Sequence, residues 1–350
     1  MWLGTNSAHT PPTAGRHALG AGRHALGAGC HALGAGRHAL GAGASAEASG
    51  VLPRRPKRAD IALNAMATVL IEFFTQTGST NAVADTIASV LRGDGHVVTV
   101  VKNGEAGPVD ITAYDVVGVG SPTYAYRLPF PVSARLESYG GLNGKGFFAF
   151  VTYGTFYGKA PRQAWAMLAK KKGVHLGTHV TRGQDLFVAY LERGALFAPD
   201  SPTPAELGAV ESFARDVSMR IEKREAADPP PRAKLGLVYR IERLLFARPL
   251  ARGLYSRLFR VNTDRCTSCG RCAEICPVDN IVIKDNTPTF GRECILCFSC
   301  RLRCPVEAIT APVDRKMISP FMNFNVRHAK KKGVPFVRVE QKNGRTTRVE

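Results

Sequence analysis

Between residues 66 and 226, short apolar runs rich in Val, Ile and Phe are interspersed with segments whose apolar residues recur every three or four positions. The first pattern is typical of buried strands, and the second of helices with one buried face. Strands that alternate with helices predict an α/β fold with a doubly wound parallel sheet. The expected strands are 68–74, 96–101, 115–120, 146–154 and one within 174–191, and the expected helices are 82–93, 160–173 and 203–224.

The loop TQTGSTN joins the first expected strand to the first expected helix. A loop in that position directs backbone N–H groups and a helix N-terminus to one point, where a phosphate binds well. The loop has no lysine and no Walker A pattern, which argues against a nucleoside triphosphate. The alternative is that its hydroxyls only cap the helix. A phosphate monoester is expected at Thr75, Gln76, Thr77, Gly78, Ser79 and Thr80.

Two further loops at the carboxyl ends of expected strands carry aromatic residues, in the sequences SPTYAYR and TYGTFYG. Ligands of open α/β sheets bind beyond these strand ends. Tyrosine rings beside exposed backbone amides suit a flat heteroaromatic ring, although each tyrosine taken alone is better explained by packing, and it is their place at consecutive strand ends that favours a ligand. A phosphate and a flat ring without a dinucleotide fingerprint predict flavin mononucleotide (FMN). The tyrosines are Tyr124, Tyr126, Tyr153 and Tyr157.

The TQTGSTN loop resembles the T-x-T-G-x-T phosphate loop of flavodoxins, and the chain order of the other two loops is similar to that family. The resemblance covers residues 66–226 and implies a flavodoxin-like sheet of five strands. Flavodoxins are usually strongly acidic, whereas this segment has 16 basic and 15 acidic side chains, so the family's partners are not carried over. The resemblance implies that the isoalloxazine is bordered by Ser121, Pro122, Thr123, Tyr124, Thr152, Tyr153 and Gly154.

Residues 261–314 contain eight of the nine cysteines, in two runs of the form C-x2-C-x2-C-x3-C-P. Zinc sites usually separate two ligand pairs by a dozen or more residues, so this compact spacing instead predicts two [4Fe–4S] clusters. The fourth cysteine of each run is expected to ligate the other cluster. The segment resembles the small α+β fold of bacterial two-cluster ferredoxins. The expected ligands are Cys266, Cys269, Cys272 and Cys304 for one cluster, and Cys276, Cys294, Cys297 and Cys300 for the other.

The net charge of +19 is concentrated outside these two segments. The connector 227–260 has 8 basic and 2 acidic side chains, and the tail 315–350 has 10 and 2. Folded segments that are nearly neutral argue against a nucleic-acid-binding domain. The connector, which is amphipathic after three prolines, either packs as a helix between the domains or lies on an anionic membrane surface. The tail is expected to be solvated; the alternatives are packing through Phe321, Phe324 and Phe336, or docking to an acidic partner or membrane.

Residues 1–65 contain four near-identical units of the form GRHALGA, with Cys30 in place of arginine in the third. Two glycines and one leucine per unit provide no apolar seam for a coiled coil. The histidines and Cys30 could bind a metal, but nothing in the sequence fixes their geometry. The segment is expected to be disordered, and the globular protein is expected to begin at Met66.

These features together resemble flavodoxin–ferredoxin fusion proteins and predict an electron-transfer protein that relays electrons between FMN, two clusters and external redox partner proteins. The sequence shows no constellation typical of a general base or nucleophile. The first alternative is an oxidoreductase that reduces a small substrate or quinone with cluster-delivered electrons, and the second is an electron-input subunit that attaches to a membrane complex through the connector. The clustered cysteines, without a spread disulfide framework, predict a reducing, cytoplasmic location.

Overall fold

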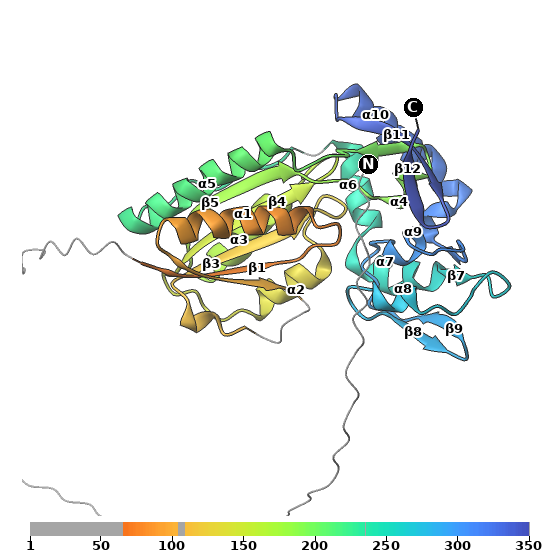
Figure 1. Ribbon diagram of the computed structural model, residues 1–350, viewed down its shortest axis with the longest axis horizontal. Coiled ribbons are helices and arrows are strands. Elements are labelled where there is room, and N and C mark those ends of the chain that lie inside the picture. The colour runs from red at the N-terminus through yellow and green to blue at the C-terminus, as the bar shows by residue number, and fades with distance from the viewer. Residues whose placement is uncertain (1–65, 104–108, 235, 350) are drawn as a thin grey trace, which may run out of the picture. The chain divides into compact units, whose positions relative to one another are not determined.

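Five parallel strands form the central sheet of the N-terminal part of the fold (Figure 1). The computed structural model describes residues 66–103, 109–234 and 236–349, so the predicted disorder of 1–65 lies outside it. The strand order is β2-β1-β3-β4-β5, with every neighbouring pair parallel. This confirms the predicted flavodoxin-like sheet. The strands are β1 (Thr68–Phe73), β2 (Val97–Lys102), β3 (Val116–Pro122), β4 (Gly146–Tyr153) and β5 (Val174–Arg182).

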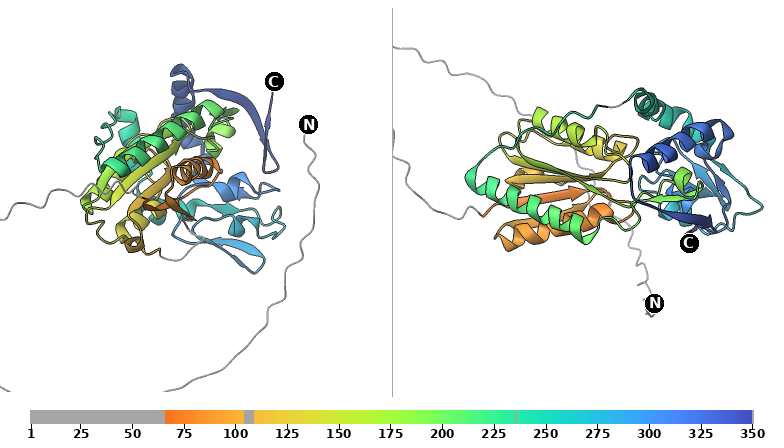
Figure 2. Two further views of the ribbon diagram at one scale, coloured as in Figure 1. Left: turned by 60° about the vertical axis from the view of Figure 1, so that its left-hand side comes forward. Right: turned by 90° about the horizontal axis from the view of Figure 1, so that it is seen from above.

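Helices cover both faces of this sheet, as Figure 2 shows from above. Alternate residues of β3 and β4 enter two separate cores, because successive side chains of a strand point to opposite faces. Val116 and Phe148 pack with α1 and α5, whereas Val117 and Phe147 pack with α2 and α3. The covering helices are α1 (Ser79–Gly93), α2 (Phe130–Ser138), α3 (Ala160–Lys170) and α5 (Pro204–Lys223).

Helix α2 is absent from the predicted elements, and a buried carboxylate of the sheet explains its position. Glu72 on β1 is 5% exposed. It accepts hydrogen bonds from Arg135 Nε of α2 at 2.7 Å and from the hydroxyl of Tyr139 at 2.7 Å. A buried charge requires such partners, so α2 satisfies a polar group that lies inside an otherwise apolar strand.

The region after residue 226 contains short elements around the cysteine runs. The connector forms two helices and a 3-10 turn, and the cysteine segment forms two antiparallel strand pairs, β7–β10 and β8–β9. None of the described helices is long and apolar enough to cross a membrane. The elements are α6 (Leu237–Leu245), α7 (Arg248–Gly253), η2 (Tyr255–Leu258), β7 (Arg260–Val261), α8 (Arg271–Glu274), β8 (Ile281–Lys284), β9 (Thr287–Phe290), α9 (Ser299–Leu302) and β10 (Ile309–Thr310).

The described part of the C-terminal segment, residues 315–349, is folded, so the predicted solvated tail is wrong. It forms α10 (Ser319–Lys331), β11 (Phe336–Lys342) and β12 (Arg345–Arg348). β11 pairs with β12 and with β6 (Ala195–Phe197), which lies between β5 and α5 in the chain. The basic side chains that suggested solvation lie on the exposed faces of these elements. The packing uses Met322, Val326, Ala329 and Val339 rather than Phe324 and Phe336, which remain 38% and 39% exposed.

The apolar core of the cysteine segment is therefore assembled from three separate stretches of chain. Phe298 and Ile309 of that segment share a core with the C-terminal Met322 and with Tyr190 and Phe197 from the chain between β5 and α5. The last two residues belong in sequence to the flavodoxin-like segment. The ferredoxin-type region is thus held by elements on both sides of it in the chain.

Replacing Met322 with alanine tests whether the C-terminal segment is part of this core. Met322 is fully buried, so Met322→Ala should lower the free energy of unfolding by about 2–5 kcal/mol through lost contacts and a residual cavity. Phe324→Ala, on the same helix but 38% exposed, is the matched control and should cost about 1 kcal/mol or less. Denaturant unfolding followed by circular dichroism measures both values. Equal values would show that α10 does not contribute to the core.

Candidate functional site

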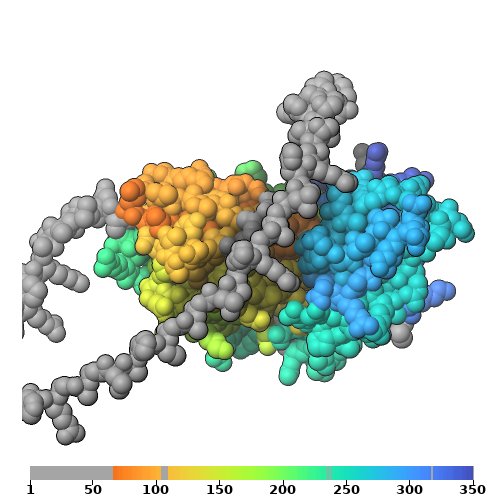
Figure 3. Space-filling model, turned by 90° about the horizontal axis from the view of Figure 1, so that it is seen from below, coloured from red at the N-terminus to blue at the C-terminus, as the bar shows by residue number. Residues whose placement is uncertain are grey.

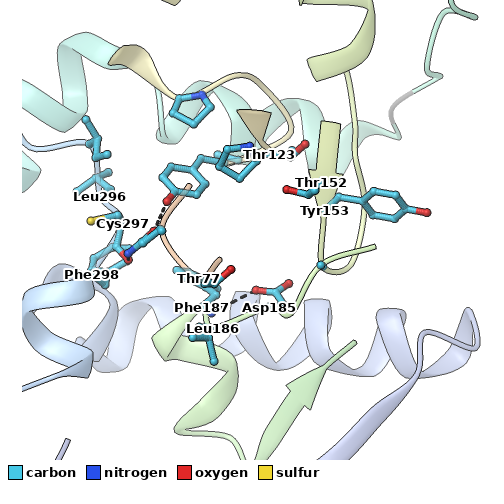
Figure 4. A pocket seen from close by; sticks show the side chains of 18 of the residues that line it. Thr77, Thr123, Thr152, Tyr153, Asp185, Leu186, Phe187, Leu296, Cys297 and Phe298 are labelled. Atoms are coloured by element: carbon cyan, nitrogen blue, oxygen red, sulfur yellow. Dashed lines mark hydrogen bonds between the residues drawn. The ribbon is translucent and has the colours of Figure 1, made fainter. Parts of the chain in front are cut away.

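A cavity opens at the carboxyl ends of β1, β3 and β4, where the sequence predicts the ligand (Figure 4). The volume that the centre of a water molecule can reach inside it is about 180 Å³, far above the roughly 10–15 Å³ that one buried water needs. Thr77 and Thr123 come from two of the predicted loops, and Tyr153 lies across the cavity from Cys297. The site thus brings together the flavodoxin-like loops and the second cysteine run.

Ten of the thirteen residues predicted to bind FMN line this cavity, and three do not. Thr75 and Gly78 shape the loop instead, because the Thr75 hydroxyl accepts a hydrogen bond from the Gly78 N–H at 3.1 Å. Ser121 is buried, and its hydroxyl donates to the Pro122 carbonyl at 2.8 Å. The ten that line the cavity are Gln76, Thr77, Ser79, Thr80, Pro122, Thr123, Tyr124, Thr152, Tyr153 and Gly154.

The N-terminus of α1 is arranged as an anion site. Gly78 precedes the helix with φ of +90°, a conformation that favours glycine, and no side chain caps the helix. The alternative that the loop hydroxyls only cap α1 is therefore wrong. The hydroxyls of Thr80 and Thr152 lie 2.8 Å apart, and the first turn carries no acidic residue. Free N–H groups, hydroxyls and the positive end of the helix dipole together fit a phosphate monoester.

Tyrosine, glutamine and serine side chains connect the sheet loops to the cysteine segment. The Tyr124 hydroxyl donates to Gln76 Oε1, and Gln76 Nε2 donates to the Ser299 hydroxyl. Gln76 Nε2 also lies 3.4 Å from the Cys297 carbonyl. On the opposite side of the cavity, Tyr153 is half-buried. The guanidinium carbon of Arg182 lies over the Tyr153 ring, 5.3 Å from its centre. The cavity therefore has an aromatic wall formed by the sheet loops and a backbone wall formed by the cysteine segment.

The second wall consists of Ile295, Leu296, Cys297 and Phe298. Leu296 and Phe298 both have positive φ, +56° and +57°, so the backbone turns tightly around the cysteine between them. Figure 4 shows the Cys297 sulfur on the side of this wall that faces away from the cavity. A cofactor held by the Cys297 sulfur would be separated from a ligand in the cavity only by this wall.

The two cysteine runs have the same backbone geometry. Ser268 and Gly270 flank the second cysteine of the first run with φ of +53° and +73°, as Leu296 and Phe298 do in the second run. The fourth cysteine of each run also accepts an equivalent hydrogen bond: Asn280 N–H donates to Cys276 Sγ at 3.2 Å, and Ala308 N–H to Cys304 Sγ at 3.3 Å. Such turns direct backbone N–H groups toward a common point and favour an anionic group there, iron–sulfur clusters included.

The structure brings the four cysteines of one predicted set together. A small cavity is lined by Cys266, Cys269, Cys272 and Cys304, which includes the last cysteine of the second run. Burial raises the pKa of Cys294 to about 12 and that of Cys297 to about 11, and the Cys276 thiol contributes to both shifts. Within the described residues, no three His, Cys, Asp or Glu side chains converge closely enough to hold one metal ion. This arrangement agrees with the predicted exchange of the fourth ligand, which itself remains a prediction.

The cavity is also lined by two carboxyl groups that the sequence did not identify, the partly buried Asp185 and the buried Glu242. Burial raises the pKa of Asp185, in the loop after β5, to about 6, and the group accepts the Phe187 N–H at 3.2 Å. Glu242, on α6, is 5% exposed, and burial raises its pKa to about 7. Its carboxylate accepts hydrogen bonds from the Tyr126 hydroxyl at 2.9 Å and from the Asn325 side-chain amide at 3.2 Å. Asp185 could have been found from its place at a strand end, whereas Glu242 resembles an ordinary solvated charge.

Comparisons with known proteins identify both domains. The chain matches the family model described as "Flavodoxin domain" at residues 70–163 and the one described as "4Fe-4S binding domain" at 259–282, which contains the first cysteine run. An uncharacterized ferredoxin of Methanocaldococcus jannaschii is 51% identical over 39 residues. That match spans 11% of this chain and 26% of the ferredoxin, so the chain spans about a quarter of that relative's length.

The two solved structures described next each match less than half of this chain. A flavodoxin from the domain Archaea is 16% identical, with a TM-score of 0.35, and the match covers 44% of this chain and 99% of that one. The rubredoxin:oxygen oxidoreductase of Desulfovibrio gigas is 20% identical, with a TM-score of 0.37, and covers 46% and 37% of the two chains. The family matches, with the observed sheet, show that this chain carries a flavodoxin domain followed by a 4Fe-4S ferredoxin domain.

Proposed function

We propose that the protein binds one FMN and two [4Fe–4S] clusters and relays electrons between external redox partner proteins in the cytoplasm. The observation that carries this proposal is one cavity lined both by the flavodoxin loops and by the Cys297 wall. FMN can accept one or two electrons, whereas each cluster transfers one at a time. Joining them in one chain therefore allows conversion between one-electron and two-electron partners.

The residues of the cavity fit FMN at both of its ends. Ser79 and Thr80, with the uncapped start of α1, would hold the phosphate. Tyr124 and Tyr153 would contact the flat ring, because aromatic faces stack well on heteroaromatic systems. Gln76, which hydrogen-bonds to both Tyr124 and Ser299, lies where it would orient the ring relative to the cysteine wall.

The burial of the cysteines supports a fixed order of the two clusters. The cluster of Cys276, Cys294, Cys297 and Cys300 would lie next to the flavin, since Cys297 is part of the cavity wall. The other set contains Cys269, which is exposed to solvent. The ferredoxin-type region presents an outer surface of its own, cyan to blue in Figure 3. Electrons would therefore pass between an external partner and the flavin by way of the outer cluster and then the inner one.

The two carboxyl groups that line the cavity favour the alternative function, an oxidoreductase that reduces a small substrate or a quinone. Reduction of a flavin by two electrons, or of a quinone, takes up protons. Glu242 has a pKa near 7 and is held by Tyr126 and Asn325, so its carboxyl can hold and release a proton at the edge of the cavity. Asp185 is a second group of this kind in the same cavity.

Cofactor content in matched cysteine variants tests the electron relay. Protein purified without oxygen should contain about eight irons and one FMN per chain. Cys276→Ser should damage the cluster shared with Cys294, Cys297 and Cys300 and spare the other, leaving a single cluster signal in electron paramagnetic resonance. Cys30→Ser, which changes the only cysteine outside the two runs, should retain all the iron.

The same variant separates a relay from two independent cofactors. If the inner cluster connects the outer one to the flavin, Cys276→Ser should slow flavin reduction after the outer cluster is reduced, and Cys30→Ser should not. About four irons and no flavin in the native protein would contradict the proposal. Unchanged flavin reduction in Cys276→Ser would contradict the order of the clusters.

Two glycines with the same backbone conformation test the phosphate site. Gly78 and Gly95 have φ of +90° and +91°, and a Cβ at either position would meet no atom within 4 Å. Alanine should therefore cost a similar amount of stability at each, about 1–2 kcal/mol. Only Gly78→Ala alters the loop in front of α1, so it should weaken FMN binding by about tenfold or more, whereas Gly95→Ala should leave it unchanged. Titration of flavin-free protein with FMN, followed by flavin fluorescence, measures the difference; equal affinities would place the phosphate elsewhere.

The pH dependence of stability tests the proton held by Glu242. Its pKa rises from 4.5 to about 7 on folding, so the folded state binds the proton more tightly between these values. The stabilisation from this proton is full below pH 4.5 and is lost as the pH rises through 7, and the buried carboxylate then costs up to about 3 kcal/mol. Glu242→Gln should therefore become more stable relative to the native protein as the pH rises from about 5 to 8.

Denaturant unfolding across that pH range measures the difference between the two proteins. Glu222→Gln, at an exposed position of α5, is the control and should follow the native curve. A Glu242→Gln curve parallel to the native one would show that the carboxyl does not hold its proton near pH 7.

A further inference from the structure

Helix α6 is turned so that its apolar side faces the solvent. Leu237, Ile241, Leu244 and Leu245 are 71%, 46%, 69% and 42% exposed. Glu242, in contrast, is buried and accepts hydrogen bonds from Tyr126 of the flavodoxin domain and from Asn325 of α10. A helix that packs on a protein core normally has the opposite orientation, with its leucines inside and its carboxylate in water. We call the exposed stripe of Leu237, Ile241, Leu244 and Leu245 the outer face of α6. Contact with water is unfavourable for these apolar side chains, so the orientation of the helix needs another explanation.

The charges next to the outer face are positive. Between residues 237 and 260 there are six arginines and one acidic residue, the buried Glu242; one of the six, Arg252, forms an ion pair with Glu293 of the cysteine segment. Arg240 is three residues after Leu237 and four before Leu244, so it borders the apolar stripe along the helix. Arg248 and Arg257, in α7 and η2, are exposed, as is Leu254 between them. Aliphatic side chains flanked by arginines are characteristic of helices that lie in the interface of an anionic membrane.

We propose that the outer face of α6, with the exposed residues of α7 and η2, docks the protein on an anionic membrane surface. The four aliphatic side chains enter the boundary between lipid headgroups and acyl chains. The arginines extend to the phosphates at headgroup level, because their long apolar stems let the charged ends remain in the polar layer. This proposal uses only the surface of the chain and does not depend on the proposed electron relay.

The size of the outer face favours a lipid surface over a protein partner. A helix of nine residues is about 14 Å long, and a stable protein interface buries about 800 Å² on each partner. Four aliphatic side chains on so short a helix are well below that area. A membrane surface requires no matching shape, and the arginines add attraction to anionic lipid over the whole patch.

Docking in this orientation also places the cofactor cavity close to the membrane. Glu242 and Phe246, which lie on or directly after α6, both line the cavity. The inner side of the helix thus belongs to the cavity wall while its outer face contacts lipid. The separation between them is about one helix diameter, roughly 10–12 Å.

Vesicle binding by the full-length, cofactor-loaded protein tests the proposal. Vesicles of phosphatidylcholine alone are compared with vesicles that also contain phosphatidylserine, by sedimentation at low and at high salt. One variant, Leu237→Ser with Leu244→Ser, removes two aliphatic side chains of the outer face. A second, Arg240→Gln with Arg248→Gln, removes two charges. The control is Val97→Ser with Val282→Ser, two valines that are 52% and 53% exposed on β2 and β8.

The native protein and the valine control should bind the phosphatidylserine vesicles, more tightly at low salt. The leucine variant should bind at least about tenfold more weakly, because two side chains lose their burial in lipid. The arginine variant should also bind about tenfold more weakly and lose much of its salt dependence. Iron and flavin contents equal to those of the native protein exclude misfolding of either variant.

Three results would overturn the proposal. The first is the absence of binding of the native protein to phosphatidylserine vesicles at low salt. The second is equal binding by the leucine variant and the valine control. The third is self-association of the native protein in sedimentation velocity that the leucine variant abolishes, since a second copy of the chain would then cover the outer face.

Discussion

The position of Cys297 in one wall of the cavity is the constraint on which the rest of the structure depends. Cysteine binds iron as the thiolate, and a thiolate in a poorly hydrated place is unfavourable. Burial raises the pKa of Cys294 and Cys297 accordingly. A positively charged iron centre would remove this conflict, and the N–H groups that point at Cys276 Sγ and Cys294 Sγ would reduce it further. The compact spacing of the two cysteine runs meets the same need, because tight turns bring backbone N–H groups close to the cysteine sulfurs.

The cysteine wall also needs support from outside its own segment, since a region this small has little core of its own. Phe298 packs against Phe187, from the chain between β5 and α5, with ring centres 5.7 Å apart. Arg301 pairs with Glu192 of that same stretch at 2.8 Å. The pairing of β6 with β11 then ties the C-terminal segment to both. The flavodoxin domain thus provides the surface on which the ferredoxin-type region is assembled, and this keeps Cys297 at the cavity.

The sequence predicted the parts of the molecule whose signals are local. Strand periods, the TQTGSTN loop and the doubled cysteine runs are each readable over a dozen residues, and the predicted strands lie within a few residues of those observed. The predictions that failed share one cause: the structure of those segments depends on contacts with residues far away in the sequence. Met322 and Val339 are buried in a core that includes Phe197 of β6, the strand of three residues with which β11 pairs. α2 is positioned by a carboxylate on β1, more than sixty residues before Tyr139.

The same cause explains why the connector was left with two interpretations. An amphipathic pattern defines two sides of a helix but not which of them faces the protein. In α6 that choice is made by Tyr126 and Asn325, which bind Glu242 from two other elements and so hold the polar side inward. The two interpretations were that the connector packs against the domains or that it contacts a membrane. They exclude each other for an isolated helix, but they are compatible for α6 in this orientation. One side of α6 completes the cavity wall, and no other described residue covers its apolar side, for which we propose contact with a membrane.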